Sequence, residues 1–111
     1  MTRLAGDEVR RALEEIPEPI RHSAREVPIF LEATPTASDV TEGIAEDTLG
    51  LFDEGPSGLP TPRIRLWLVN LWDYAEADPG IFREEVRTTL LHELGHFLGW
   101  DEDDLEERGL G

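Results

Sequence analysis

Residues 88–104 read TTLLHELGHFLGWDEDD, and this stretch places two histidines one helical turn apart with a glutamate beside the first. On a helix, His92 and His96 project from one face, because residues four apart lie above one another. Both imidazoles can then reach one cation, and neutral imidazole is a favoured ligand of zinc. Glu93 is rotated toward the place where a metal-bound water would sit, so its carboxylate can take that water's proton.

The residues around this motif predict the helix that it needs. A helix is expected over residues 79–98, with Asp78 as its N-cap, Pro79 in its first turn and Gly99 at its C-terminal end. At roughly 100° per residue, both histidines of the motif fall on the side opposite one apolar stripe. The stripe consists of Val86, Leu90, Leu94 and Phe97.

Two polar residues share the predicted histidine face of this helix. Glu85 and Thr89 lie there, and each is interpreted either as a hydrogen-bond partner of a metal ligand or as an ordinary exposed residue. The histidine face is therefore expected to point away from the core.

A third metal ligand is expected just after the helix. The pattern extends to H-E-x-x-H-x-x-G-x-x-E, in which Gly99 lets the chain turn and Glu102 stands where a longer motif of this type returns a histidine. Zinc accepts carboxylate oxygen, so Glu102 is the predicted third ligand. Asp101 and Asp103 remain alternatives, because a one-residue change in the turn would exchange them. Glu106 would serve if the ligand came from a following helix.

The rest of the sequence predicts a small α+β fold in one domain, residues 1–111. A first helix is expected at residues 7–16, resumed briefly at 20–26, and one or two final helical turns are expected at 101–108. Residues rich in β-formers predict strands, of which the last, apolar on both faces, is the strongest. These strands are at 26–32, 47–54 and 63–72. Loops are predicted by composition at residues 33–43 and 55–62.

Composition excludes several classes of partner and site. A net charge of −15 and a pI near 4.3 argue against nucleic acid and anionic membranes as partners. All ten cationic residues are arginine. The acidity is interpreted chiefly as a solvated surface, and alternatively as a field that gathers cations or basic peptides. The absence of cysteine removes disulfides and thiolate ligands, and the lack of an apolar leader or span makes a cytoplasmic protein the expectation.

Over its second half the chain resembles the small bacterial family of minimal zincin-like metallopeptidases. The resemblance rests on RIRLWLVNLW (63–72) and EEVRTTLLHELGHFLGWDEDDLEERGL (84–110), with DTLGLFDE (47–54) similar to the family's short upstream segment. Relatives commonly carry aspartate where this chain has Glu102, and often a second histidine where it has Phe97.

This resemblance implies a fold and a reaction. The fold would be minimal zincin-like, with a small, mostly antiparallel or mixed sheet packed on an N-terminal helix and a long H-E-x-x-H helix. The resemblance also implies zinc at His92 and His96, with Glu93 as the base that activates water for hydrolysis of a peptide or protein substrate. Two alternatives remain: a zinc-binding interaction module with little hydrolysis, and an accidental histidine pair that binds nothing.

Other residues that could carry chemistry are given structural interpretations. His22 is expected to be exposed, and Tyr74 to anchor a loop rather than to stabilise an oxyanion. Trp67 and Trp72 are expected to pack in and around the core. The acidic run at residues 101–104 does not fit a calcium-binding EF-hand, which needs glycine and glutamate at set later positions.

Overall fold

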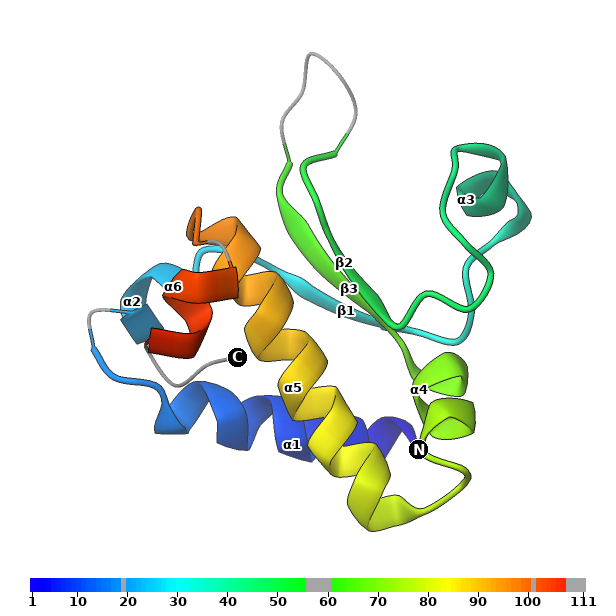
Figure 1. Cartoon of the computed structure of the whole chain (residues 1–111), viewed down its shortest axis with the longest axis horizontal. Helices are drawn as coiled ribbons and strands as arrows, with labels where there is room; N and C mark the ends of the chain where they lie inside the picture. The colour runs from blue at the N-terminus through cyan, green and yellow to red at the C-terminus, as the bar shows by residue number, and fades with distance from the viewer. Residues whose placement is uncertain (19, 56–60, 101, 108–111) are drawn as a thin grey trace.

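The computed structural model describes residues 1–18, 20–55, 61–100 and 102–107, apart from the side chains of Glu102, Leu105 and Glu106. The elements of the chain follow one another from α1 to α6 (Figure 1). They are α1 (Thr2–Glu15), α2 (Ile20–Ala24), β1 (Ile29–Glu32), α3 (Ala37–Thr41), β2 (Gly50–Asp53), β3 (Arg63–Trp67), α4 (Leu68–Tyr74), α5 (Pro79–Phe97) and α6 (Glu102–Glu107).

The sheet is mixed, with the strand order β1-β3-β2. The central strand β3 runs parallel to β1, with Leu66 opposite Leu31, and antiparallel to β2, with Ile64 opposite Phe52. The predicted α+β class with a small mixed sheet is therefore confirmed. Among the described residues β2 pairs with β3 alone, so its other side is an edge of the sheet.

Helices α1 and α5 cover one face of the sheet and pack against each other, with α5 crossing α1 obliquely in Figure 1. Helix α5 packs on β2 and β3, and α1 packs on α5 and β1. Alternate residues of β3 point toward these helices, because successive side chains of a strand lie on opposite faces. The largest fully buried side chains are Trp67, Phe82, Ile64, Leu66, Leu71, Leu90, Leu94 and Val86.

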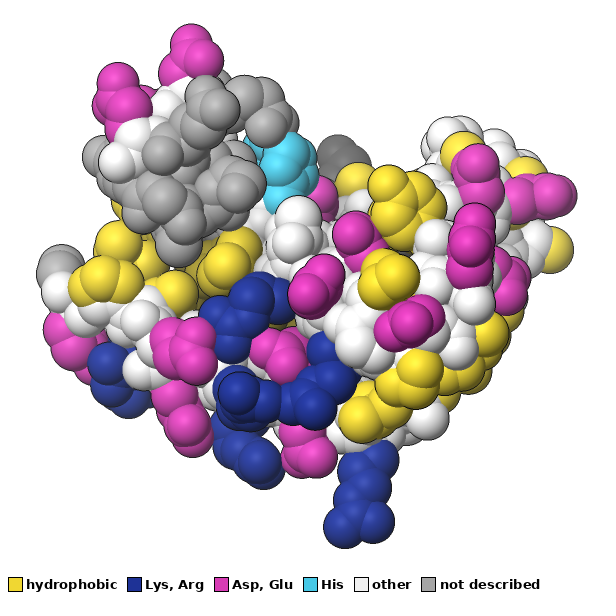
Figure 2. Space-filling model, turned by 60° about the horizontal axis from the view of Figure 1, so that its bottom comes forward, with side chains coloured by type: hydrophobic (Ala, Val, Ile, Leu, Met, Phe, Trp, Pro, Cys, Tyr) yellow, Lys and Arg dark blue, Asp and Glu magenta, His cyan; other side chains and the backbone are white. Residues whose placement is uncertain are grey.

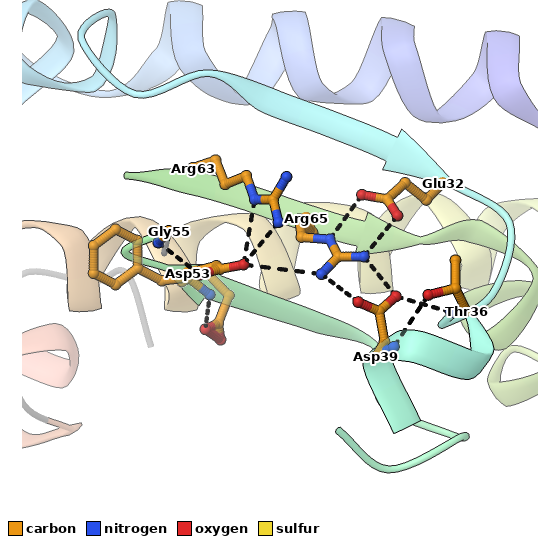
Figure 3. A network of polar contacts seen from close by, with 9 residues as sticks. Glu32, Thr36, Asp39, Asp53, Gly55, Arg63 and Arg65 are labelled. Atoms are coloured by element: carbon orange, nitrogen blue, oxygen red, sulfur yellow. Dashed lines mark hydrogen bonds and ion pairs between the residues drawn. The ribbon is translucent and has the colours of Figure 1, made fainter. Parts of the chain in front are cut away.

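The other side of β3 carries a buried cluster of charges centred on Arg65 (Figure 3). Its guanidinium donates to both carboxylate oxygens of Glu32, at 2.8 and 2.9 Å, and of Asp39, at 2.9 and 2.7 Å. The cation also lies 4.9 Å from the centre of the Trp67 ring. Hydrogen bonds from Arg65 hold the pKa of Asp39 far below its usual range. This Arg65 cluster therefore joins β3 to β1 and α3.

The strand predicted at residues 63–72 is wrong in its second half, because β3 ends at Trp67 and α4 begins at Leu68. Leu68 and Leu71 lie three residues apart and both are buried, which is the period of a helix and not of a strand. The Asn70 amide donates to two backbone carbonyls of the loop before β2 and fixes α4 there. The part that remains a strand is buried on both faces, as predicted.

Residues 33–43, predicted as a loop, contain the short helix α3. The Thr36 hydroxyl accepts from the Asp39 N–H at 3.1 Å, and the Asp39 carboxylate accepts from the Thr36 N–H at 2.8 Å. This reciprocal capping box is visible in the sequence as T-x-x-D, but it lies within a loop-like composition. Asp39 also pairs with Arg65, so a contact distant in sequence helps to stabilise the helix.

The first helix begins at Thr2, ahead of the predicted start at Asp7. Its Glu8 side chain accepts hydrogen bonds from Arg83 and Arg87 of α5, at 3.2 and 2.9 Å. Burial raises the pKa of Glu8, but these hydrogen bonds outweigh it and leave the pKa below its usual value. The short helices near residues 20–26 and 101–108 are confirmed as α2 and α6. Within the predicted loop at 55–62, residues 56–60 lie outside the described residues.

Candidate metal centre

Helix α5 carries the H-E-x-x-H motif and has defined ends. The Asp78 side chain caps its first turn by accepting from the Ile81 N–H at 3.0 Å. After the last turn, Gly99 has φ +79°, and its N–H donates to the His96 carbonyl at 3.0 Å. The next N–H, of Trp100, donates to the carbonyl of Gly95 at 2.9 Å, which completes a Schellman turn. The predicted cap and stop are confirmed.

The core side of α5 determines where its histidines point. Val86, Leu90 and Leu94 are fully buried or nearly so, and Phe97 packs its ring 5.7 Å from that of Phe52 in β2. On the remaining side of the helix, the first histidine of the motif is half-buried and the second is exposed. The prediction that both histidines face away from the core is confirmed.

His92, Glu93 and His96 form a group whose ligand atoms lie within 4.8 Å of one another. The two Nε2 atoms face each other at 3.1 Å. Two nitrogens bound to one tetrahedral zinc ion at its usual bond length would be roughly 3.3–3.4 Å apart. The donor types and their spacing therefore fit a zinc ion, with a movement of only a few tenths of an ångström. This set of three residues is called the His92–Glu93–His96 group below.

Glu93 is tied to the edge strand β2. Its Oε1 accepts a hydrogen bond of 2.9 Å from the Phe52 N–H. The Leu49 carbonyl accepts from the N–H of Trp67, so by the alternation of an antiparallel pair the polar groups of Gly50 and Phe52 point outward from β3. The sequence does not reveal this contact, because Phe52 and Glu93 are 41 residues apart.

A glycine permits the close approach of β2 to α5. A Cβ atom on Gly50 would lie 2.5 Å from Thr89 Cγ2 and 3.0 Å from Leu66 Cδ2. Both distances are shorter than ordinary van der Waals contact. Gly50 therefore allows the strand to lie against the helix that carries the histidines.

Two hollows adjoin the His92–Glu93–His96 group along the seam between β2 and α5. One has a volume of about 280 Å³ and the other of about 470 Å³. The smaller is lined by Leu49, Gly50, Glu85, Thr88, Thr89, His92 and Glu93. The larger is lined by Phe52, Glu54, Pro62, His96, Phe97 and Gly99. The group thus lies between two open spaces that follow the free edge of β2.

The third ligand was predicted among the residues that follow α5. Glu102 is the first residue of α6, and its side chain lies outside the described residues, as does that of Glu106 and the whole of Asp101. Asp103 is described and exposed, and it is not part of the His92–Glu93–His96 group.

The remaining candidate residues are placed as follows. His22 is exposed on α2, and Trp67 and Trp72 pack in and beside the core, as predicted. Tyr74 is 62% exposed at the end of α4 and lines neither hollow beside the histidine pair. Glu85 was interpreted either as a hydrogen-bond partner of a metal ligand or as an ordinary exposed residue. It is half-buried and lines the smaller hollow.

A known protein family matches most of the chain. Residues 24–111 match a family model described as Zincin-like metallopeptidase. The matched range contains the whole sheet and α5, and it leaves α1 outside. Curated protein sequences gave no match. Among the described residues, no helix has the length and apolar character needed to cross a membrane.

Proposed function

Because the chain belongs to the zincin-like metallopeptidase family, we propose that it is a zinc-dependent peptidase. The observation that carries this proposal is the His92–Glu93–His96 group, whose histidines face away from the core while Glu93 accepts a hydrogen bond from the edge strand β2. A structural metal site needs ligands alone, whereas this group adds a carboxylate next to the ligands.

In the proposed centre, His92 and His96 bind zinc through Nε2, and Glu102 supplies the third protein ligand. Support for the histidines comes from their facing nitrogens, 3.1 Å apart. Support for Glu102 comes from the Schellman turn at Gly99, which ends α5 and turns the chain toward α6. A zinc ion bound there supplies Lewis-acid polarisation of the substrate carbonyl and a lowered pKa for a coordinated water.

Glu93 is the proposed general base and acid. Its Oε1 is engaged by the Phe52 N–H, so Oε2 is the oxygen that takes the proton of the attacking water and passes it to the leaving amine. The backbone hydrogen bond keeps the carboxylate at one orientation between β2 and α5. This orientation matters for the proposed catalysis, because a general base must lie within hydrogen-bond distance of the proton that it takes from water.

The substrate is proposed to be an extended peptide that pairs with β2. Strand addition to a free sheet edge binds peptides through their main chain. The outward groups of Gly50 and the Phe52 carbonyl are the pairing sites that Glu93 does not occupy. A peptide in this position would pass the His92–Glu93–His96 group and send its side chains into the two hollows.

The proposal is tested by elemental analysis and peptide hydrolysis on tag-free protein purified without chelator. Wild-type protein should hold close to one zinc ion per chain, and His92→Ala and His96→Ala should lose it. Glu93→Gln should keep the zinc, while hydrolysis falls by about 10²- to 10⁴-fold because proton transfer is lost.

Matched variants separate the ligands from other residues of the same type. His22→Ala, at the exposed third histidine, should leave the zinc content unchanged, and Glu102→Ala should weaken zinc binding where Asp103→Ala does not. Wild-type protein without zinc, even after zinc is added back, would refute the metal centre. Zinc bound without hydrolysis of any peptide in a broad library would instead identify an interaction module.

A further inference from the structure

The smaller hollow, next to His92, has the size and walls of a side-chain subsite. Its volume of about 280 Å³ is enough for a single long side chain of a peptide paired with β2. Among the described residues, its walls are uncharged apart from Glu85 and Glu93, and consist otherwise of Leu49, Gly50, Thr88, Thr89 and His92.

Glu85 lies at the far end of this hollow. It precedes His92 by seven residues, which is two turns and roughly 10 Å along the same side of the helix. Arg83 and Arg87 point instead toward α1, where both donate to Glu8. Glu85 is half-buried and forms no hydrogen bond or ion pair within the described part of the chain. A carboxylate in this position favours a cationic partner, because partial burial is costly for a charge that has none.

The larger hollow, next to His96, has a different chemistry. Phe52, Pro62 and Phe97 give it apolar walls, and the exposed Glu54 lies at its border. Strand β2 runs from Gly50, beside the smaller hollow, to Phe52, beside the larger one. A peptide antiparallel to β2, the more stable way of pairing, would place its earlier side chain in the larger hollow and its later one in the smaller.

The charge around the two hollows also favours a cationic partner. Among the residues that the structure describes, no arginine lines either of them. Figure 2 shows most of the arginine side chains of this face gathered in one patch, apart from the histidine surface. In a chain with a net charge of −15, the resulting field attracts a basic peptide.

On these observations, and resting on the peptidase function proposed above, we propose that Glu85 selects a lysine or arginine side chain of the substrate. Because both hollows lie on the α5 side of β2, the apolar residue held by Phe52 and Phe97 and the basic residue are two positions apart in the peptide, and the cleaved bond lies between them. The basic side chain lays its apolar stem along Leu49 and the threonine methyl groups, and its charged tip meets Glu85. Glu85 is thus a specificity-determining residue.

The test uses four peptides that differ at one tripeptide: Phe-Ala-Arg, Phe-Ala-citrulline, Phe-Ala-Glu and the reversed Arg-Ala-Phe. They are named below by their two outer residues, as Phe-Arg, Phe-citrulline, Phe-Glu and Arg-Phe. Citrulline keeps the shape of arginine but lacks its charge. Wild-type kcat/KM for Phe-Arg should exceed that for Phe-citrulline by about tenfold to a hundredfold, as for a hydrogen bond between charged groups. Glu85→Gln should remove this preference, and Glu85→Arg should favour Phe-Glu. Glu84→Gln, at an exposed neighbour, is the matched control.

A binding measurement keeps this inference separate from the proposed function. The same peptides are titrated calorimetrically into Glu93→Gln and Glu85→Gln/Glu93→Gln, where turnover is not required. Tighter binding of Phe-Arg than of Phe-citrulline, lost with Glu85, supports the inference even if nothing is cleaved. Equal cleavage of Phe-Arg and Phe-citrulline, or equal binding, overturns it and leaves the peptidase standing. Faster cleavage of Arg-Phe than of Phe-Arg overturns the proposed direction.

Discussion

The Arg65 cluster and the His92–Glu93–His96 group lie on opposite sides of the sheet and satisfy their charges differently. Arg65 is 5% exposed, and the carboxylates of Glu32 and Asp39 both accept hydrogen bonds from it. The His92–Glu93–His96 group is half-buried to exposed, adjoins two hollows, and forms no ion pair with arginine within the described residues. One centre uses its charges to join chain segments, and the other faces space that a ligand can fill.

This difference distinguishes a structural polar centre from a binding one. A buried charge is tolerated only when it is paired, so a saturated cluster has no capacity left for a ligand. A binding site must keep donor atoms directed at open space, and it is held in shape by few contacts. Here the Phe52–Glu93 hydrogen bond is one such contact. Two substitutions and one change of pH test whether the two centres behave independently.

The largest effect is expected from Arg65→Met. Removing this cation leaves two carboxylates without their partner, which should lower the free energy of unfolding by about 3–5 kcal/mol in urea titrations. Arg63→Met is the matched control on the same strand, because Arg63 is 39% exposed and pairs with Asp53 at 3.0 Å. Its loss should stay under about 1 kcal/mol. Equal losses of unfolding free energy in Arg65→Met and Arg63→Met would show that burial does not determine how much these ion pairs contribute to stability.

A smaller effect is expected from Gly50→Ala, at the place where β2 meets α5. The added methyl group would meet Thr89 Cγ2 at 2.5 Å, and such overpacking typically costs about 1–3 kcal/mol. The strand should move away from α5, and the NMR shift of the Phe52 amide should report a weakened bond to Glu93. Gly50→Ala/Thr89→Ala should recover part of both losses. An unchanged Phe52 amide in Gly50→Ala would refute the role of Gly50 in positioning β2.

The smallest effect on stability is expected from lowering the pH. The pKa of Asp39 is lowered by its hydrogen bonds from Arg65, so the stability it contributes is present above the usual aspartate pKa and is lost as the pH falls toward the lowered value. On the order of 1 kcal/mol should be lost through Asp39 by pH 3. Arg65→Met should flatten this part of the profile. An equally steep profile in that variant would assign the acid sensitivity to other groups.

Most elements were predictable because their signals are local. The cap at Asp78, the stop at Gly99 and the apolar stripe fixed α5 and the direction of its histidines within one segment. The run at 63–72 was misassigned at Leu68 because uninterrupted apolar residues fit either period. Helix α3 was missed because Asp39 owes part of its role to Arg65, which is 26 residues away.

The sequence by itself determined that two imidazoles lie one helical turn apart with a carboxylate beside the first, and that both imidazoles avoid the core, because helix periodicity places them so. Only the tertiary structure decided what that turn faces. The Phe52–Glu93 hydrogen bond, the close approach at Gly50 and the hollow lined by Glu85 all lie where α5 meets β2. Such contacts depend on how separate elements pack, and no local spacing of residues specifies that packing.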